Sequence, residues 1–403
     1  MATVLTNETF NEYITTGLAF ELLPKTFQDA VLFTRSLGKR YLWIDSLCII
    51  QNNADDWDRE AATVCSVYQG ALLTIAAASS SSGRGGLLYE PPTHRITRTT
   101  PNGPYTLFGR ESIRHKEKEY PLLTRGWASQ ERLLSPRTLY FGSKELLWER
   151  RGSRTCQCGE SVSSHIGGDV SKVYQTTTAG AASLDGGRLI SQWHRLVSRF
   201  SQLCLSYEKD VLPDISGLAA QFAEIRRLRE PTTYHAGLWS NSFEADLLWY
   251  RDRGWEHDQR ASRPVSYRAP TWSWASVNGP ISWIEGFMGC KAEENFEVLH
   301  IPKSSELDGQ PGPVSHLILK GMPVCLPMRL ADQDLDGSPT FLWDCHVRQE
   351  EDTETYCLRL FHQGSSGMEW YSLVLNVIDE EAQTYERLGV LRLATALVET
   401  PIE

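Results

Sequence analysis

The first hundred residues alternate between amphipathic stretches and short, mostly apolar runs. Apolar side chains recur at helical spacing over residues 24–38 and again over residues 55–69, where three aspartates crowd the start of the stretch. Residues 41–50 and 71–78 are mostly apolar, as is typical of strands buried on both faces. Strand, helix and strand with short connections predict a parallel pair joined by a βαβ crossover. The N-terminal region is therefore expected to be an α/β domain.

The pattern changes further along the chain. It predicts a hairpin turn at Pro101–Pro104, strands near residues 138–141 and 146–148, helices near 189–207 and 218–228, and short antiparallel strands after residue 268. Trp272 and Trp274 alternate within one such strand and are expected to form a core ridge. We predict an α+β protein overall. Its expected parts are an α/β domain (1–150), a Gly/Ser/Thr-rich loop (151–188), a helical segment (189–260) and a β-rich region (261–403).

Composition excludes several classes of protein. The net charge of −10 argues against a general nucleic-acid binder, which needs a basic face. No apolar stretch approaches the roughly 18 residues of a membrane span, and the first residues do not have the pattern of a secretory signal. We therefore expect a cytoplasmic location, and reduced thiols for the nine scattered cysteines. The 13 tryptophans are expected mainly in cores.

Several ordered blocks carry a family resemblance. They are Leu23–Ala30, Tyr41–Gln51, Asp56-Trp57, Val67-Tyr68, Leu73–Ala77 and Arg125–Arg137. In this order they closely resemble the heterokaryon incompatibility (HET) domain of fungal proteins, over about residues 18–150. Weaker similarity to longer family members continues at 210–219, 236–239 and 268–276. The resemblance implies a TIR-like parallel sheet with flanking helices and a role in nonself recognition by programmed cell death.

One departure from the family affects the expected site. HET domains normally begin with a strand of the type Leu-Ser-Tyr-Cys-Trp-Gly ahead of the Leu-Pro-Lys-Thr block, and this sequence has no such motif. Either the chain is truncated or this member has abandoned the ancestral site. Without that strand, sheet edges are exposed and a nucleotide cleft loses one wall.

Two carboxylates are the candidate catalytic residues. By resemblance to TIR-like enzymes that hydrolyse NAD, Glu60 could stabilise the cation that forms as nicotinamide leaves. The alternative, which we favour, is a solvated carboxylate near the start of its helix. Asp45 interrupts an apolar run and needs a partner if buried. It either forms a structural ion pair with Arg125 or Arg132, which we favour, or positions a ligand.

The candidate ligand-binding residues lie near these carboxylates and in the Arg125–Arg137 block. Arginine forks suit phosphate or carboxylate ligands, but the same charges could fix a helix to the sheet, and Trp127 could belong to the core. The set is Trp43, Arg125, Trp127, Glu131 and Arg132.

Two other sequence features are weaker evidence for a binding site. Ser79–Gly86 follows a predicted strand, as a phosphate loop would, but lacks the Gly-Lys-Ser/Thr ending. Cys156 and Cys158 with His165 resemble a metal set, but zinc needs a fourth ligand from afar, such as Cys204. We therefore expect no metal and no cofactor.

Three functions stay open. The first is incompatibility cell death with little NAD hydrolase activity; the second is a HET-derived enzyme of specialised metabolism acting on a small molecule in a tryptophan-lined pocket. The third is a non-catalytic scaffold. A protein partner, self-association and a small-molecule ligand all remain compatible with the sequence, whereas general nucleic-acid binding and membrane insertion do not.

Overall fold

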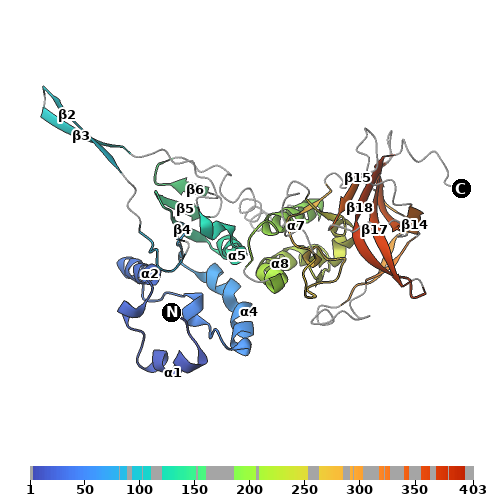
Figure 1. The fold of residues 1–403 in the computed structure, drawn as a ribbon, viewed down its shortest axis with the longest axis horizontal. Coiled ribbons are helices and arrows are strands. Elements are labelled where there is room, and N and C mark those ends of the chain that lie inside the picture. The colour runs from blue at the N-terminus through green and yellow to red at the C-terminus, as the bar shows by residue number, and fades with distance from the viewer. Residues whose placement is uncertain are drawn as a thin grey trace. The chain divides into compact units, whose positions relative to one another are not determined.

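The computed structural model divides the chain into two compact units, residues 1–176 and 177–403 (Figure 1). Each unit has helices and strands of its own. The structure describes residues 3–80, 82–88, 93–101, 103–109, 120–150, 153–159, 186–205, 208–252, 263–284, 291–293, 295–302, 317–321, 323–326, 340–344, 355–363, 369–379 and 381–394. Residues 160–185 of the predicted loop, with His165, lie outside these ranges.

The first unit begins with helices and ends with a small sheet. Its helices are α1 (Asn7–Thr15), α2 (Lys25–Ser36), α3 (Asp45–Cys48), α4 (Ala54–Gly70) and α5 (Gly126–Leu134). Its strands are β1 (Thr74–Ala76), β2 (His94–Thr100), β3 (Gly103–Gly109), β4 (Arg137–Phe141), β5 (Leu146–Arg150) and β6 (Ser153–Cys156). The two predicted amphipathic helices are present as α2 and α4.

Local signals explain where α2 and α4 begin and where α2 ends. Asn53 caps α4 by accepting a hydrogen bond from the Asp56 amide at 3.1 Å. Pro24 precedes the first residue of α2, and Gly38 follows the helix with φ +67°, a conformation that suits glycine. These signals are local, so the sequence alone contains them.

The sheet of the first unit has the order β1-β4-β5-β6. β1 pairs parallel with β4, in the register Thr74 opposite Thr138, whereas β4, β5 and β6 form an antiparallel meander. The protein is thus α+β, but this mixed sheet is not the parallel TIR-like sheet that the resemblance implied. Its apolar core includes Ala76, Ala78, Tyr140, Leu147 and Cys156.

The predicted strand over residues 41–50 is wrong. Residues 41–44 are not a strand, and α3 forms a single helical turn from Asp45, which is exposed rather than buried. The segment satisfies its backbone elsewhere: the Leu5 amide donates to the Ser46 carbonyl at 2.8 Å, and the Gln51 amide to the Leu5 carbonyl at 2.9 Å. A short apolar run does not distinguish a strand from a helix, and with this strand the predicted βαβ crossover is lost.

The predicted hairpin around residue 102 exists as β2 and β3, which pair in full register from His94 opposite Gly109 to Thr100 opposite Gly103. All residues of β2 are exposed, and the hairpin projects away from the sheet of its unit (Figure 1). Gly103 has φ +109°, which a tight connection between antiparallel strands favours.

The second unit combines helices with a large antiparallel sheet. Its helices are α7 (Gly186–Phe200), α8 (Val211–Arg227) and α9 (Phe243–Asp246). Four short strands, β7 (Tyr234–His235), β8 (Leu238–Trp239), β9 (Trp249–Arg251) and β10 (Ile281–Trp283), form two pairs. The remaining strands are β11 (Lys291–Ala292), β12 (Glu297–His300), β13 (Ile318–Lys320), β14 (Pro323–Leu326), β15 (Thr340–Trp343), β16 (Thr355–Gln363), β17 (Glu369–Asp379) and β18 (Thr384–Ala394).

Tryptophans fill the core of the second unit. Trp193 and Trp274 both donate from their indole nitrogens to the Gly237 carbonyl, at 3.0 and 3.1 Å. Gly237 has φ +102°, and a side chain there would overlap the Trp274 ring. Trp272 and Trp274 are buried as predicted, but they do not share a strand. The Ser273 hydroxyl accepts from the Ala275 amide and starts a 3-10 turn instead.

Candidate functional site

Four of the predicted site residues come together around a tyrosine in the first unit. We call the group Trp43, Asp45, Tyr68, Arg125 and Glu131 the Glu131 cluster. α4 supplies Tyr68, α5 supplies Glu131, and Arg125 is the residue that precedes α5. The other two members lie just before α3 and at its first residue. Segments distant in sequence therefore converge on one acidic, aromatic site.

The geometry of the cluster centres on Tyr68. Its ring meets the Trp43 ring edge to face, with centroids 5.7 Å apart and an interplanar angle of 76°. Its hydroxyl lies within hydrogen-bonding reach of the Glu131 carboxylate. Asp45 and Arg125, both exposed, are close enough for their charges to act on Glu131.

The electrostatics of the cluster set Glu131 apart. Burial, together with the negative charge of Asp45, raises its pKa to about 7, although the Tyr68 hydrogen bond and the Arg125 charge lower it. Some of the side chain reaches the surface, yet protein atoms surround the carboxylate itself. Burial also raises the pKa of Tyr68, as do the charges of Glu131 and Asp45. Glu131 can therefore take up or release a proton near neutral pH, as a general acid or base must.

Cys48 and Glu60 lie at the margin of this cluster. Cys48 is exposed, but protein atoms around its sulfur and the charges of Asp45 and Glu60 raise the pKa of its thiol. Such a thiol stays protonated and is a poor nucleophile.

Glu60 itself faces partly into solvent. Its side chain is 30% exposed. It contacts Arg59, with Nε 3.8 Å from Oε1, and the Thr63 hydroxyl, 3.5 Å from Oε2. A carboxylate in contact with water stabilises a cation far less than an enclosed one. This placement fits the solvated alternative better than the catalytic one.

Arg132 points into a buried network. It donates from Nε to Glu149 at 2.9 Å, and the same carboxylate accepts from Arg154 at 2.8 Å and from the Tyr140 hydroxyl at 2.6 Å. The arrangement fixes α5 to the sheet, which is the alternative to ligand binding that the sequence left open for Arg132.

Trp127 packs edge to face on Trp57, with centroids 6.4 Å apart, and is partly buried. The pair joins α5 to α4. Neither Arg132 nor Trp127 is a member of the Glu131 cluster.

The ion pair predicted for Asp45 is not observed. Among the described residues, Asp45 has no basic side chain within salt-bridge distance, and its carboxylate accepts instead from the Ser46 amide at 2.7 Å. Because the residue is exposed at a helix start, water and the backbone satisfy it.

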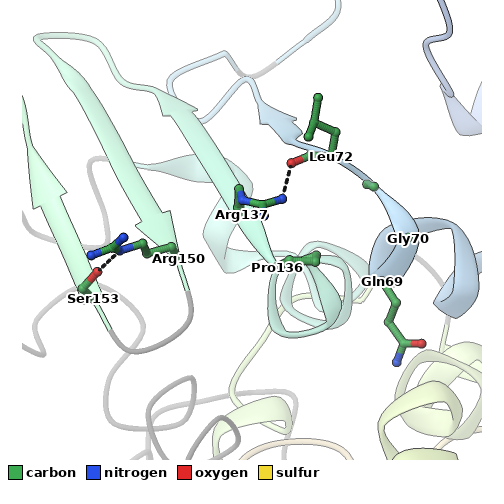
Figure 2. Close-up of a pocket in the computed structure, with 8 residues that line it drawn as sticks. Gln69, Gly70, Leu72, Pro136, Arg137, Arg150 and Ser153 are labelled. Carbon is green, nitrogen blue, oxygen red and sulfur yellow. Dashed lines mark hydrogen bonds between the residues drawn. The ribbon is translucent and has the colours of Figure 1, made fainter.

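An open groove of about 830 Å³ lies elsewhere in the first unit (Figure 2). Arg137 and Arg150 stand directly opposite each other on β4 and β5 and both line it. Arg137 donates to the Leu72 carbonyl at 3.1 Å and Arg150 to the Ser153 hydroxyl at 2.9 Å. No tryptophan and no predicted site residue is among the lining residues, which are Gln69, Gly70, Ala71, Leu72, Pro136, Arg137, Arg150 and Ser153.

Sequence reasoning did not select two residues of these sites. Tyr68 falls on the apolar stripe of its helix, which suggested a core position. Arg150 follows a predicted strand and carries no motif.

The structure also gathers metal-ligand side chains at a different edge of the sheet, at Glu145, Cys156 and Cys158. Along the described residues, every helix is too short or too polar to cross a membrane.

Comparison with known proteins adds one finding. Residues 3–131 match the family model described as heterokaryon incompatibility protein (HET), a range that contains all five residues of the Glu131 cluster. The matched range starts and ends earlier than the resemblance at residues 18–150 suggested. No curated protein and no solved structure matches the chain.

Proposed function

Because the chain carries a heterokaryon incompatibility domain at residues 3–131, we propose that it acts in fungal nonself recognition, with this domain triggering cell death. The observation that carries the proposal is that the matched range folds into the Glu131 cluster. There a carboxyl group with a pKa of about 7 lies beside Tyr68 and the exposed Arg125. Such a site can respond to a ligand or a partner through one proton.

The proposal includes little or no NAD hydrolysis. Cleavage of the nicotinamide–ribose bond needs a carboxylate held in a dry, preformed cleft. Glu60 is 30% exposed and does not line the groove of Figure 2. Its exposure supports the view that this residue does not catalyse the reaction.

A growth assay tests the main proposal. The full chain is expressed from an inducible promoter in a fungal host beside an empty vector, Glu131→Gln and Glu60→Ala. Glu12→Gln is the matched control, because Glu12 is an exposed helical glutamate of the same unit. We expect the wild type, Glu12→Gln and Glu60→Ala to slow growth and Glu131→Gln to slow it less. Normal growth of the wild-type strain at confirmed expression would refute the proposal.

A second assay tests the NAD statement. Purified protein is incubated with NAD, and released nicotinamide is measured by chromatography. We expect release at the level of a heat-inactivated control. Turnover that Glu60→Ala abolishes would show that a working cleft exists.

One observation favours a second candidate, a HET-derived enzyme acting on a small molecule. Glu131 has the pKa that general acid–base catalysis at neutral pH requires, and Trp43, which packs on Tyr68, offers an apolar contact. The groove of Figure 2 lacks tryptophan, so it is not the tryptophan-lined pocket expected for such an enzyme. A gene location among biosynthetic genes, together with an activity whose pH profile shifts in Asp45→Asn, would favour this candidate.

A further inference from the structure

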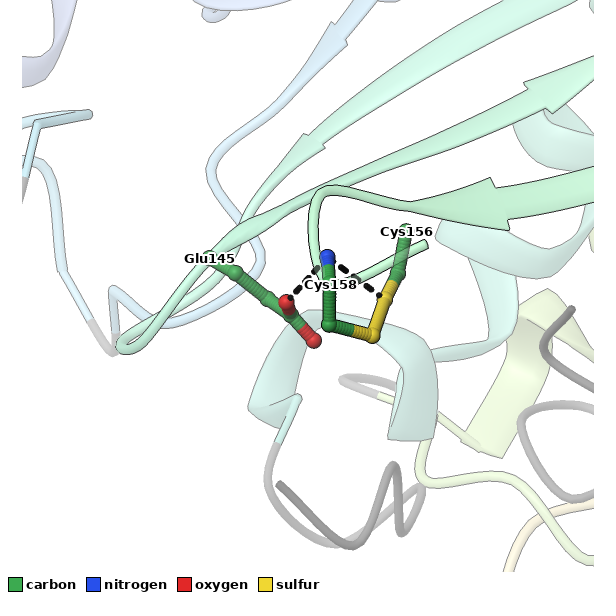
Figure 3. A group of neighbouring side chains, drawn as sticks. All are labelled: Glu145, Cys156 and Cys158. Carbon is green, nitrogen blue, oxygen red and sulfur yellow. Dashed lines mark hydrogen bonds between the residues drawn. A yellow bond between two sulfur atoms is a disulfide. The ribbon is translucent and has the colours of Figure 1, made fainter. Parts of the chain in front are cut away.

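Three side chains with metal-binding atoms meet at one edge of the first unit's sheet (Figure 3). They are Glu145 from the β4–β5 turn, Cys156 at the end of β6, and Cys158 just beyond it. One ligand atom from each, a carboxylate oxygen or a sulfur, lies within 4.8 Å of the other two. Glu145 and Cys156 are buried and Cys158 is exposed, so the cluster opens to solvent on one side.

The strand register brings these residues together. β5 and β6 pair with Leu147 opposite Cys156, which places the β4–β5 turn beside the end of β6. The Gln157 amide continues the pairing by donating to the Leu146 carbonyl at 3.0 Å. Sequence spacing could not reveal this group, because Glu145 is supplied by a separate turn.

A tight turn then folds Cys158 back over the group. The Gly159 amide donates to the Cys156 carbonyl at 3.0 Å, and Gly159 has φ +84°, which glycine adopts without strain. The Cys158 amide points inward, where it donates to Glu145 Oε2 at 3.0 Å and to Cys156 Sγ at 3.2 Å (Figure 3). An amide that donates to sulfur favours the thiolate, the form that binds metals.

The donor set selects the ion. Two thiolates and a carboxylate carry three negative charges in a partly buried site, an arrangement that a bound cation stabilises. Thiolates with a carboxylate are ligands of zinc, which takes four ligands in tetrahedral geometry. The exposed side of Cys158 leaves room for water as the fourth.

We propose that the reduced chain binds one zinc ion through Glu145, Cys156 and Cys158. In the structure the two sulfurs are bonded to each other, so the proposed site forms only after this disulfide is reduced. A phosphine reductant achieves this: water supplies the oxygen that the phosphine gains, and two protons and two electrons open the disulfide to two thiols. Zinc then displaces the two thiol protons as it binds.

Zinc titration of the full chain tests the proposal. The protein is reduced with a phosphine, stripped of metal under nitrogen, and titrated with zinc against a chromophoric chelator; cobalt in place of zinc reports thiolate ligation by its charge-transfer absorption. We expect one ion per reduced chain, a thiolate-to-cobalt band, and no uptake by the oxidised chain. Failure of the reduced chain to bind zinc overturns the site.

Variants identify the ligands. Loss of a residue that only supports a metal ligand typically weakens metal binding 10- to 100-fold, so Cys158→Ser and Glu145→Gln are expected to weaken it at least about 10-fold. Cys158 is exposed, so its replacement leaves the core intact and keeps the test valid if Glu145→Gln does not fold. Cys204→Ser is the matched control, since Cys204 is an exposed free cysteine of the other unit. Unchanged binding in Cys158→Ser, or loss in Cys204→Ser, overturns the assignment.

Discussion

Replacing Glu131 with glutamine is expected to remove a pH dependence of stability that the wild-type protein shows. The pKa of Glu131 is about 7 in the folded protein, against 4.5 for an ordinary glutamate. Between these values the folded state keeps a proton that the unfolded state has released. The free energy of unfolding therefore falls as pH rises through this window, and is lowest above about pH 7.

The size of the effect follows from the pKa difference. One pKa unit corresponds to about 1.4 kcal/mol, so a rise from 4.5 to about 7 corresponds to about 3 kcal/mol. Because part of the side chain reaches the surface, this is an upper figure. Glutamine resembles the protonated acid in shape and charge, so the variant lacks this contribution.

Urea unfolding measured between about pH 4 and about pH 8 provides the assay. The difference in unfolding free energy, wild type minus Glu131→Gln, is expected to fall by up to about 3 kcal/mol over this range. Asp45→Asn should lower the pKa of Glu131 and shrink the fall, whereas Arg125→Ala should raise the pKa and extend it. A difference that stays constant with pH would refute the reasoning.

Three further substitutions test the packing. Glu149→Ala removes the carboxylate shared by Arg132 and Arg154 and is expected to cost about 3–5 kcal/mol in urea unfolding. Arg150→Glu replaces a like-charge cross-strand pair with an opposite one and should stabilise the protein by about 0.2–1 kcal/mol in thermal unfolding. Gly237→Ala should cost more than about 1 kcal/mol, because its φ is +102° and the new methyl group would overlap a buried indole.

Matched variants separate these causes. Gly103→Ala has a similar φ of +109° but no atom within 4 Å of the added carbon, so it should cost less than Gly237→Ala. Equal losses of stability in the two variants would show that backbone strain, and not the overlap with the indole, causes the loss. Glu12→Ala removes an exposed carboxylate and should change stability by less than about 0.5 kcal/mol. A loss below about 1 kcal/mol in Glu149→Ala would mean that water replaces the missing carboxylate.

The fold was predictable where local signals decide it. Asn53 and Gly38 mark helix ends through their own side-chain and backbone preferences. The pairing of β2 with β3 follows from the Pro, Asn and Gly residues between Pro101 and Pro104. The run at 41–50 was not predictable, because its apolar content fits a strand and a short helical turn equally well. The backbone of this run and of the residue after it hydrogen-bonds to Leu5, and no local rule identifies a hydrogen-bond partner so far along the chain.

The candidate site was predictable in part. Trp43, Asp45, Arg125 and Glu131 were named from the sequence blocks, and the fold brings them to one place. Tyr68 lies on the apolar stripe of α4, and only the tertiary structure reveals that its hydroxyl reaches a carboxylate. The partner of Arg132 had an overlooked signal, since Glu149 shares a strand face with buried Leu147 and a charge on such a face needs a partner.

The β2–β3 hairpin has a consequence for how the chain can vary in length. It lies between β1 and β4, which pair although Thr74 and Thr138 are 64 positions apart. Closing such a loop costs chain entropy that grows only logarithmically, by about 0.6 kcal/mol for each doubling of its length. A peptide inserted between the exposed strand β2 and β3, such as an affinity tag, should therefore have little effect on the pairing of β1 with β4.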